Sequence, residues 1–95
     1  MNSKQRSFLK GIAMTTEPIF QIGKSALTPE LTTAVGEALE KRELVKISVL
    51  QNCLDDPKDM AARLADRTQS EVVQVIGKKI VLYRQAKEEK HRKIV

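Results

Sequence analysis

Residues 28–50 read TPELTTAVGEALEKRELVKISVL and predict a helix followed by a strand. Thr28 can cap the helix, Pro29 suits its first position, and Glu30 places an acid near its positive end. Apolar residues at helical spacing then form one buried stripe: Leu31, Ala34, Val35, Ala38 and Leu39. The helix is therefore expected to run to about residue 41.

Residues 44–50 carry the clearest strand pattern in the chain. Val45, Ile47 and Val49 share one face, while Lys46 and Ser48 lie on the other. Together with Gln74 further along, the two polar residues predict that one face of the sheet is at least partly solvated.

The sequence on either side predicts two more helices and three more strands. Ser3 can cap a helix over residues 4–14, with Phe8, Leu9, Ile12 and Ala13 on its buried side. A short strand follows at residues 19–22. Asp56 and Pro57 start a third helix, which buries Met60, Ala61, Leu64 and Ala65. Residues 72–76 and 80–83 form the last strands, joined by a turn at Gly77-Lys78.

The predicted order is α-β-α-β-α-β-β in one compact α/β domain. Two strand–helix–strand units indicate a four-stranded mixed sheet with right-handed crossovers. Residues 87–95 carry charge with almost no apolar side chains. We therefore place the domain at 1–86, and 87–95 is expected to be a charged C-terminal tail that is mobile or ordered by a partner.

Positive charge gathers at both ends of the sequence. Residues 1–24 hold four basic residues and one acidic residue, and residues 77–95 hold seven and two, whereas residues 25–76 hold six and nine. If the fold brings the two ends together, they form one positive patch suited to phosphate or another polyanion. Basic termini that only keep the chain in solution are the plainer interpretation.

The sequence gives little evidence for a catalytic site, a metal site or a membrane-spanning segment. Cys53 is the single cysteine, and its one candidate partner, His91, lies in the charged tail. We therefore expect no enzyme, no metal or cofactor, and a reducing cytoplasmic location. No signal peptide or membrane-spanning run is visible.

The stretch from residue 22 to residue 28, IGKSALT, is the best candidate site. A P-loop would need a Gly at position 18, where Pro18 stands. The stretch does join a strand to a helix N-terminus, where free backbone N–H groups and the helix dipole favour an anion. Gly23 and Lys24 would then let the backbone clamp a phosphate. An ordinary connection with a solvated lysine explains the same residues equally well.

Four stretches resemble the CRM domain family, in particular its stand-alone bacterial YhbY-like members. They are KQRSFLK at 4–10, IGK at 22–24 with Leu27-Thr28, ALE at 38–40 with ELVK at 43–46, and VQVIGK at 73–78 with VLYR at 81–84. The resemblance implies a domain similar to the C-terminal domain of bacterial initiation factor three. It also implies RNA binding, with the single-domain bacterial members associated with precursors of the large ribosomal subunit.

The loop departs from the family's Gly-x-x-Gly pattern, which is similar to that of KH domains. Ala26 stands at the second Gly, and it is strained if that position needs a positive φ. Our first hypothesis is a monomeric RNA-binding factor for large-subunit precursor RNA. Its expected contacts are Gly23, Lys24, Ser25, Ala26, Lys4, Arg6, Lys10, Lys78, Lys79 and Arg84. A protein-interaction adaptor that docks through a sheet face is the alternative, and duplex DNA binding is a weaker third.

Overall fold

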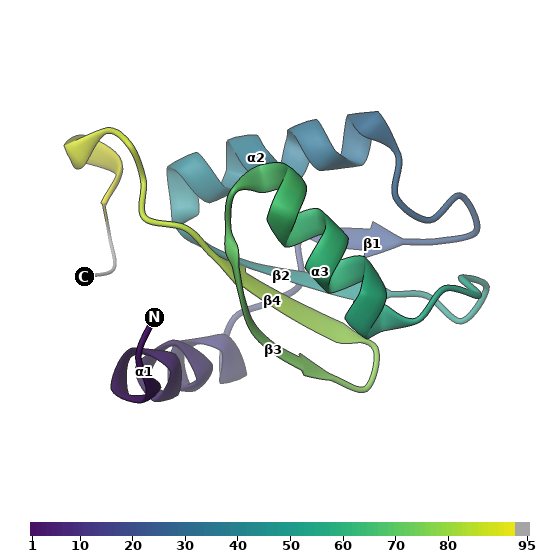
Figure 1. The fold of residues 1–95 in the computed structure, drawn as a ribbon, viewed down its shortest axis with the longest axis horizontal. Coiled ribbons are helices and arrows are strands. Elements are labelled where there is room, and N and C mark those ends of the chain that lie inside the picture. Colours follow the sequence, from purple (N-terminus) through teal and green to yellow (C-terminus); the bar gives the residue numbers. More distant parts are fainter. Residues whose placement is uncertain (93–95) are drawn as a thin grey trace.

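Residues 1–92 form three α-helices and four strands in the predicted order. They are α1 (Ser3–Met14), β1 (Phe20–Ile22), α2 (Pro29–Arg42), β2 (Leu44–Val49), α3 (Pro57–Thr68), β3 (Glu71–Ile76) and β4 (Lys79–Tyr83), followed by a short 3-10 helix, η1 (Glu89–His91). The structure is a computed structural model that describes residues 1–92 (Figure 1).

The four strands form one mixed sheet in the order β1-β2-β4-β3. β1 is parallel to β2, whereas β4 is antiparallel to both β2 and β3. The ends of β1, β2 and β3 and the start of β4 therefore meet at one end of the sheet, which we call the loop end. Residues 23–28, residues 50–56 and the turn at residues 77–78 lie there, on the right of Figure 1.

α2 and α3 cover one face of the sheet and enclose the main core. Val45, Ile47 and Val49 point into it, as the alternating pattern predicts, and each is at most 3% exposed. Leu39 of α2 and Leu64 of α3 belong to the same core cluster and contribute to it from the helix layer. Each such side chain stabilises the fold by roughly 1.5–3 kcal/mol through burial.

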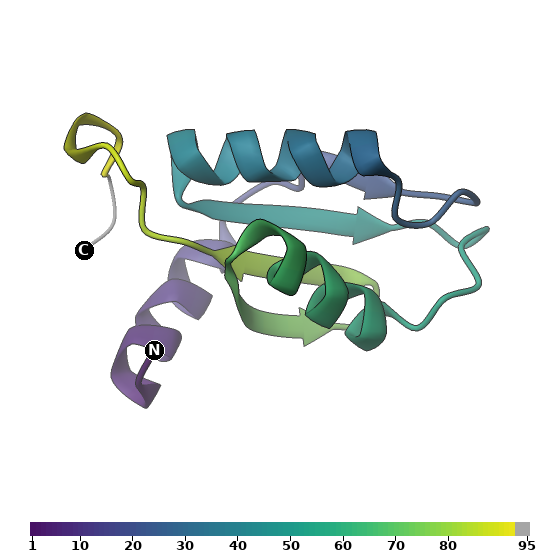
Figure 2. The same ribbon diagram turned by 45° about the horizontal axis from the view of Figure 1, so that its top comes forward.

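α1 covers only part of the opposite face (Figure 2). Leu9 and Ala13 pack there on a second cluster formed by Leu44, Val73 and Val81. Phe8 was expected in this buried stripe but is 58% exposed. Helical residues advance by about 100°, so with Leu9 and Ala13 facing the sheet, Phe8 lies at the edge of the stripe.

The rest of that face is open to solvent, as the polar positions predict. Lys46, Ser48 and Gln74 are all only half-buried. Beyond them Ile76 is 62% exposed, so this face carries an uncovered apolar side chain as well.

The helix starts follow the sequence signals, with one difference. Thr28 accepts the N–H of Leu31 at 3.1 Å, and Asp56 accepts that of Lys58 at 3.1 Å. In α1 the cap is Asn2 rather than the predicted Ser3. Asn2 and Gln5 exchange side-chain-to-backbone hydrogen bonds in a capping box, which satisfies two N–H groups where Ser3 would satisfy one.

Residues 84–92, the C-terminal segment, run back along the C-terminal half of α2 instead of leaving the domain. The N–H of Ala86 donates to a carboxylate oxygen of buried Glu43 at 2.7 Å. The N–H groups of Lys87 and Glu88 donate to Glu40 at 2.8 and 3.1 Å. Residues 87–95 were expected to be mobile or ordered by a partner. The carboxylates of Glu40 and Glu43 supply acceptors to residues 86–88 that the tail's own composition does not reveal. Residues 93–95 lie outside the described residues, and the domain boundary after residue 86 stays a prediction.

Candidate nucleic-acid interface

The β1–α2 loop, residues 23–28, is a tight turn with one left-handed residue. The N–H of Ala26 donates to the carbonyl of Gly23 at 3.0 Å, and Ala26 has φ 54°. A residue with a Cβ loses roughly 1–2 kcal/mol in this region. Ala26 is therefore strained at the position where the family pattern has its second glycine.

The hydrogen-bond donors of this site come from the loop more than from the helix. The Lys24 side chain is exposed, and within residues 1–92 the N–H groups of Lys24 and Ser25 have no protein acceptor. At the start of α2, by contrast, Pro29 has no N–H and Thr28 already accepts that of Leu31. The N-terminus of α2 therefore has fewer free N–H donors for an anion than the sequence predicts.

Gly23 is not required by the fold itself. A Cβ at this position would lie 3.5 Å from Asn52 Oδ1 and 3.6 Å from Leu50 Cδ1, which is ordinary van der Waals contact. Its φ is not in the left-handed region. A small side chain at residue 23 can therefore be accommodated, and substitutions there test binding separately from folding.

A shallow hollow lies beside the loop at the loop end of the sheet. It is lined by Lys24, Ala26, Asn52, Leu54 and Asp55, and Leu54 is 96% exposed. Lys78 and Lys79 are exposed at the same end. The α3 start adds the acids Asp56 and Asp59 there. The loop end is therefore mixed in charge, with its lysines on the loop and the hairpin.

The remaining predicted contacts lie at the opposite end of the sheet. Lys4, Arg6 and Lys10 belong to α1, and Arg84 follows β4. The structure therefore places the ten predicted residues in two groups at opposite ends of the sheet, and each group takes residues from both basic ends of the sequence. Figures 1 and 2 show α1 and the β1–α2 loop at these opposite ends.

Both arginines in the second group hold the fold together. Arg6 Nη1 donates to the carbonyls of Val72 and Val73 at 2.7 and 2.8 Å, where β3 has an irregular register. Arg84 donates to the carbonyls of Thr68 and Gly36 at 2.7 and 2.9 Å. Lys4 and Lys10 are exposed, so in this group the lysines are the residues open to a ligand.

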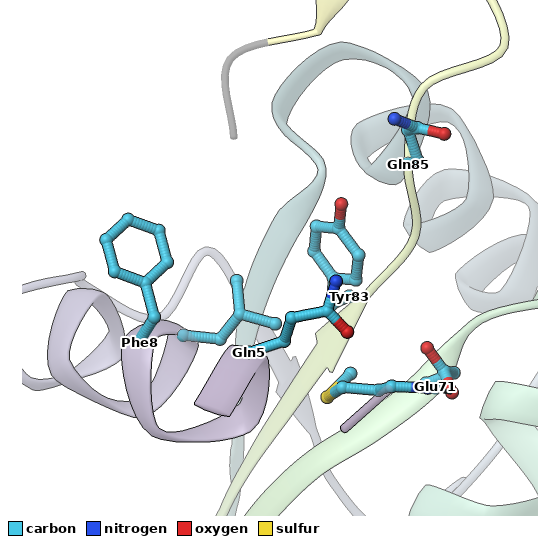
Figure 3. A pocket seen from close by; sticks show the side chains of 7 residues that line it. Gln5, Phe8, Glu71, Tyr83 and Gln85 are labelled. Carbon is cyan, nitrogen blue, oxygen red and sulfur yellow. Dashed lines mark hydrogen bonds and ion pairs between the residues drawn. The ribbon is translucent and has the colours of Figure 1, made fainter. Parts of the chain in front are cut away.

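A pocket that the sequence alone does not reveal lies between α1 and the sheet (Figure 3). Its lining combines two aromatic rings with amide and carboxylate groups: Met1, Gln5, Phe8, Leu9, Glu71, Tyr83 and Gln85. Phe8 had been assigned to the buried stripe of α1. Its marginal position relative to Leu9 and Ala13 is the signal that could have placed it on the surface.

Two groups near the C-terminal segment have shifted pKa values. The backbone N–H groups of Lys87 and Glu88 stabilise the Glu40 carboxylate and lower its pKa from 4.5 to about 2. Burial raises the pKa of Tyr83, and the negative charges of Glu43 and Glu71 add to the effect. Glu40 is thus an ionised anchor for the C-terminal segment.

The geometry gives no support to catalysis by Cys53. Its thiol is buried in the main core, with Sγ 3.7 Å from the sulfur of Met60. His91 instead lies beside Glu40, with Nδ1 3.4 Å from the carboxylate. Over residues 1–92, no group of three or more His, Cys, Asp or Glu side chains is arranged to hold a metal ion. None of the helices described is long and apolar enough to cross a membrane.

The fold and the loop define a small α/β domain that presents a strained Gly-Lys turn at one end of its sheet. The family model described as the CRS1 / YhbY (CRM) domain matches residues 1–84. The chain belongs to this family.

Bacterial relatives match nearly the whole chain. "Probable RNA-binding protein YqeI" of Bacillus subtilis is 46% identical over 90 residues, covering 95% of this chain and 94% of that protein. An "RNA-binding protein" of Haemophilus influenzae is 31% identical, with 95% and 91% covered. The solution structure of the hypothetical protein SAV1595 from Staphylococcus aureus matches with a TM-score of 0.80 and 43% identity, covering 100% of this chain and 99% of that one.

Proposed function

We propose that this protein binds RNA, without catalysing a reaction, and assists the assembly of the large ribosomal subunit on its precursor RNA. Family membership and relatives named for RNA binding support the first part. The assembly role rests on the resemblance to the stand-alone bacterial members. Such a factor would act in the cytoplasm as a monomer.

The observation that carries the proposal is the set of unused donors in the β1–α2 loop. Lys24 contributes an exposed ammonium group, and the N–H groups of Lys24 and Ser25 have no protein acceptor in the described chain. A cluster of donors of this kind suits the acceptor oxygens of a phosphate group. Lys78, at the same end of the sheet, can contact a neighbouring phosphate of the same strand. Lys79 donates to Ser48 Oγ at 3.0 Å, and the two remaining donors of its ammonium group can contact a phosphate as well.

A protein-interaction adaptor is the competing function, favoured by two apolar side chains at or near the loop end. Leu54 is 96% exposed and Ile76 is 62% exposed. A surface that binds protein through such residues gains its affinity from apolar burial, which is far less sensitive to salt than phosphate binding.

Salt dependence separates the two functions. With roughly 4–6 phosphate contacts, log K for a large-subunit RNA fragment should fall against log salt with a slope of about −3 to −5. Fluorescence anisotropy at several salt concentrations gives this slope. Lys24→Ala should make it less steep by about 1, the loss of one contact. Retained affinity with a slope near zero would contradict the proposal.

The assembly role needs a test on particles. The tagged protein should sediment with large-subunit precursors and be depleted from mature subunits, and crosslinking followed by sequencing should place it on large-subunit RNA. Crosslinks spread evenly over unrelated RNAs would leave RNA binding intact and contradict the assembly role.

A further inference from the structure

The pocket between α1 and the sheet has a volume of about 230 Å³. Phe8 rises from α1 on one side of it, and Tyr83 stands at the end of β4 on another (Figure 3). Phe8 is 58% exposed although it is a large aromatic side chain, and Tyr83 is half-buried. Pockets for drug-sized ligands have roughly 300–1,000 Å³, so this one suits a smaller group.

Polar groups with unused hydrogen-bonding capacity lie near the Tyr83 ring. Gln5 uses its Oε1 to accept the N–H of Asn2 at 3.1 Å, which leaves its amide NH₂ available. Within the described residues, neither the Gln85 amide nor the Tyr83 hydroxyl has a protein partner. Figure 3 shows the Gln5 amide next to the Tyr83 ring, with the hydroxyl pointing toward Gln85. The pocket therefore offers both donors and acceptors beside the Tyr83 ring.

The charge of α1 favours an anionic chain beside this pocket. α1 carries Lys4, Arg6 and Lys10 and no acidic residue. Lys4 lies four residues before Phe8, so the two side chains are neighbours on the helix surface. A ligand whose flat ring enters the pocket and whose phosphate lies outside it would meet Lys4.

We propose that this pocket holds one unstacked nucleobase of single-stranded RNA, packed against Phe8 and Tyr83 and hydrogen-bonded by Gln5. The inference rests on the proposed RNA-binding function and adds a second contact point to it, at the end of the sheet opposite the β1–α2 loop. Stacking on aromatic side chains accepts any base, while the Gln5 and Gln85 amides can distinguish base edges.

The protein contains its own probe for this site. It has no Trp and a single Tyr, so Tyr83 is the source of its intrinsic fluorescence. A base that stacks on the ring should quench this emission. The titrant is a single-stranded RNA hexamer, compared with an abasic ribose-phosphate chain of the same length, with free tyrosine used to correct for absorbance by the RNA.

The hexamer should quench Tyr83 saturably, whereas the abasic chain should not. Phe8→Ala should weaken hexamer binding roughly 5- to 150-fold, the range for loss of one base–aromatic stack. Phe8→Tyr keeps an aromatic ring and should bind like the wild type. Met14→Ala is the matched control, since Met14 is 81% exposed on the same helix and does not line the pocket. It should bind like the wild type.

Two outcomes would overturn the inference, and they are distinguishable. If the hexamer binds without quenching Tyr83, or binds wild type and Phe8→Ala equally, the pocket holds no base while the proposed function stands. If neither the hexamer nor a large-subunit RNA fragment binds, the proposed function fails and the inference fails with it. Circular dichroism of Phe8→Ala confirms that the comparison is made between folded proteins.

Discussion

The β1–α2 loop and the C-terminal segment are both short, charged stretches outside the regular strands, yet they are held in different ways. In the C-terminal segment, backbone N–H groups and the Arg84 guanidinium bind acceptors on α2 and α3. In the loop, Lys24 is exposed, and the N–H groups of Lys24 and Ser25 have no protein acceptor within residues 1–92. A basic residue with fixed partners supports the fold, whereas one without them is available to a ligand.

Among the residues that hold the C-terminal segment, Glu43 should have the largest effect on the free energy of unfolding when it is replaced. It is fully buried and accepts the N–H of Ala86 at 2.7 Å. Glu43→Ala leaves that N–H without its acceptor and removes buried side-chain volume, so we expect a loss of about 2–4 kcal/mol in the free energy of unfolding. Urea denaturation measures it. Glu43→Gln keeps the shape and an acceptor and should lose clearly less; equal losses would mean that the hydrogen bond is unimportant.

Arg84 comes next, and it tests whether a predicted RNA contact is structural. Arg84→Ala removes two charge-assisted hydrogen bonds, to the carbonyls of Thr68 and Gly36, and should lower the free energy of unfolding by about 1.5–3 kcal/mol. At a temperature where the variant is folded, its RNA affinity should change less than twofold. A large loss of RNA affinity with unchanged stability would show that Arg84 contacts RNA and is not mainly structural.

The stabilisation that Glu40 contributes by binding the C-terminal segment should depend on pH. Its pKa is about 2 in the folded protein against an ordinary 4.5, so its stabilising effect is complete above pH 4.5 and is lost as the pH falls toward 2. The difference in thermal midpoint between wild type and Glu40→Gln should therefore shrink over that range. Deleting residues 87–95 removes the donor N–H groups and should largely abolish the difference at pH 6; an unchanged difference would contradict the assignment.

Replacing Ala26 should change the free energy of unfolding by a smaller amount, and in the stabilising direction. With φ 54°, Ala26 costs roughly 1–2 kcal/mol, while the greater freedom of an unfolded glycine costs about 0.5–1 kcal/mol. Ala26→Gly should therefore raise the free energy of unfolding by up to about 1.5 kcal/mol and leave RNA binding equal or tighter. Destabilisation would show that the turn relaxes around Ala26.

The sequence predicts the fold well because local signals and periodicity agree in each element. Thr28 and Asp56 mark the starts of α2 and α3, and the alternation through Val45, Ile47 and Val49 assigns the buried face of β2. Where signals are weaker, the prediction is less accurate: Asn2 replaces Ser3 as the cap of α1.

The candidate site was less predictable because it depends on tertiary partners. Nothing in the local sequence shows that Arg6 and Arg84 reach backbone carbonyls far along the chain. Phe8 and Tyr83 likewise line one pocket although they come from opposite ends of the sequence. The left-handed Ala26, in contrast, follows from its place in the family's loop pattern.

The most direct test of the account is RNA affinity after Lys24→Ala, with Lys41→Ala as control. Lys41 is also exposed but lies in the last turn of α2, at the opposite end of that helix from the loop. Both substitutions should leave the free energy of unfolding within about 0.5 kcal/mol. Lys24→Ala should weaken binding to large-subunit RNA several-fold and Lys41→Ala should not; equal affinities for both variants and wild type would contradict RNA binding through the loop.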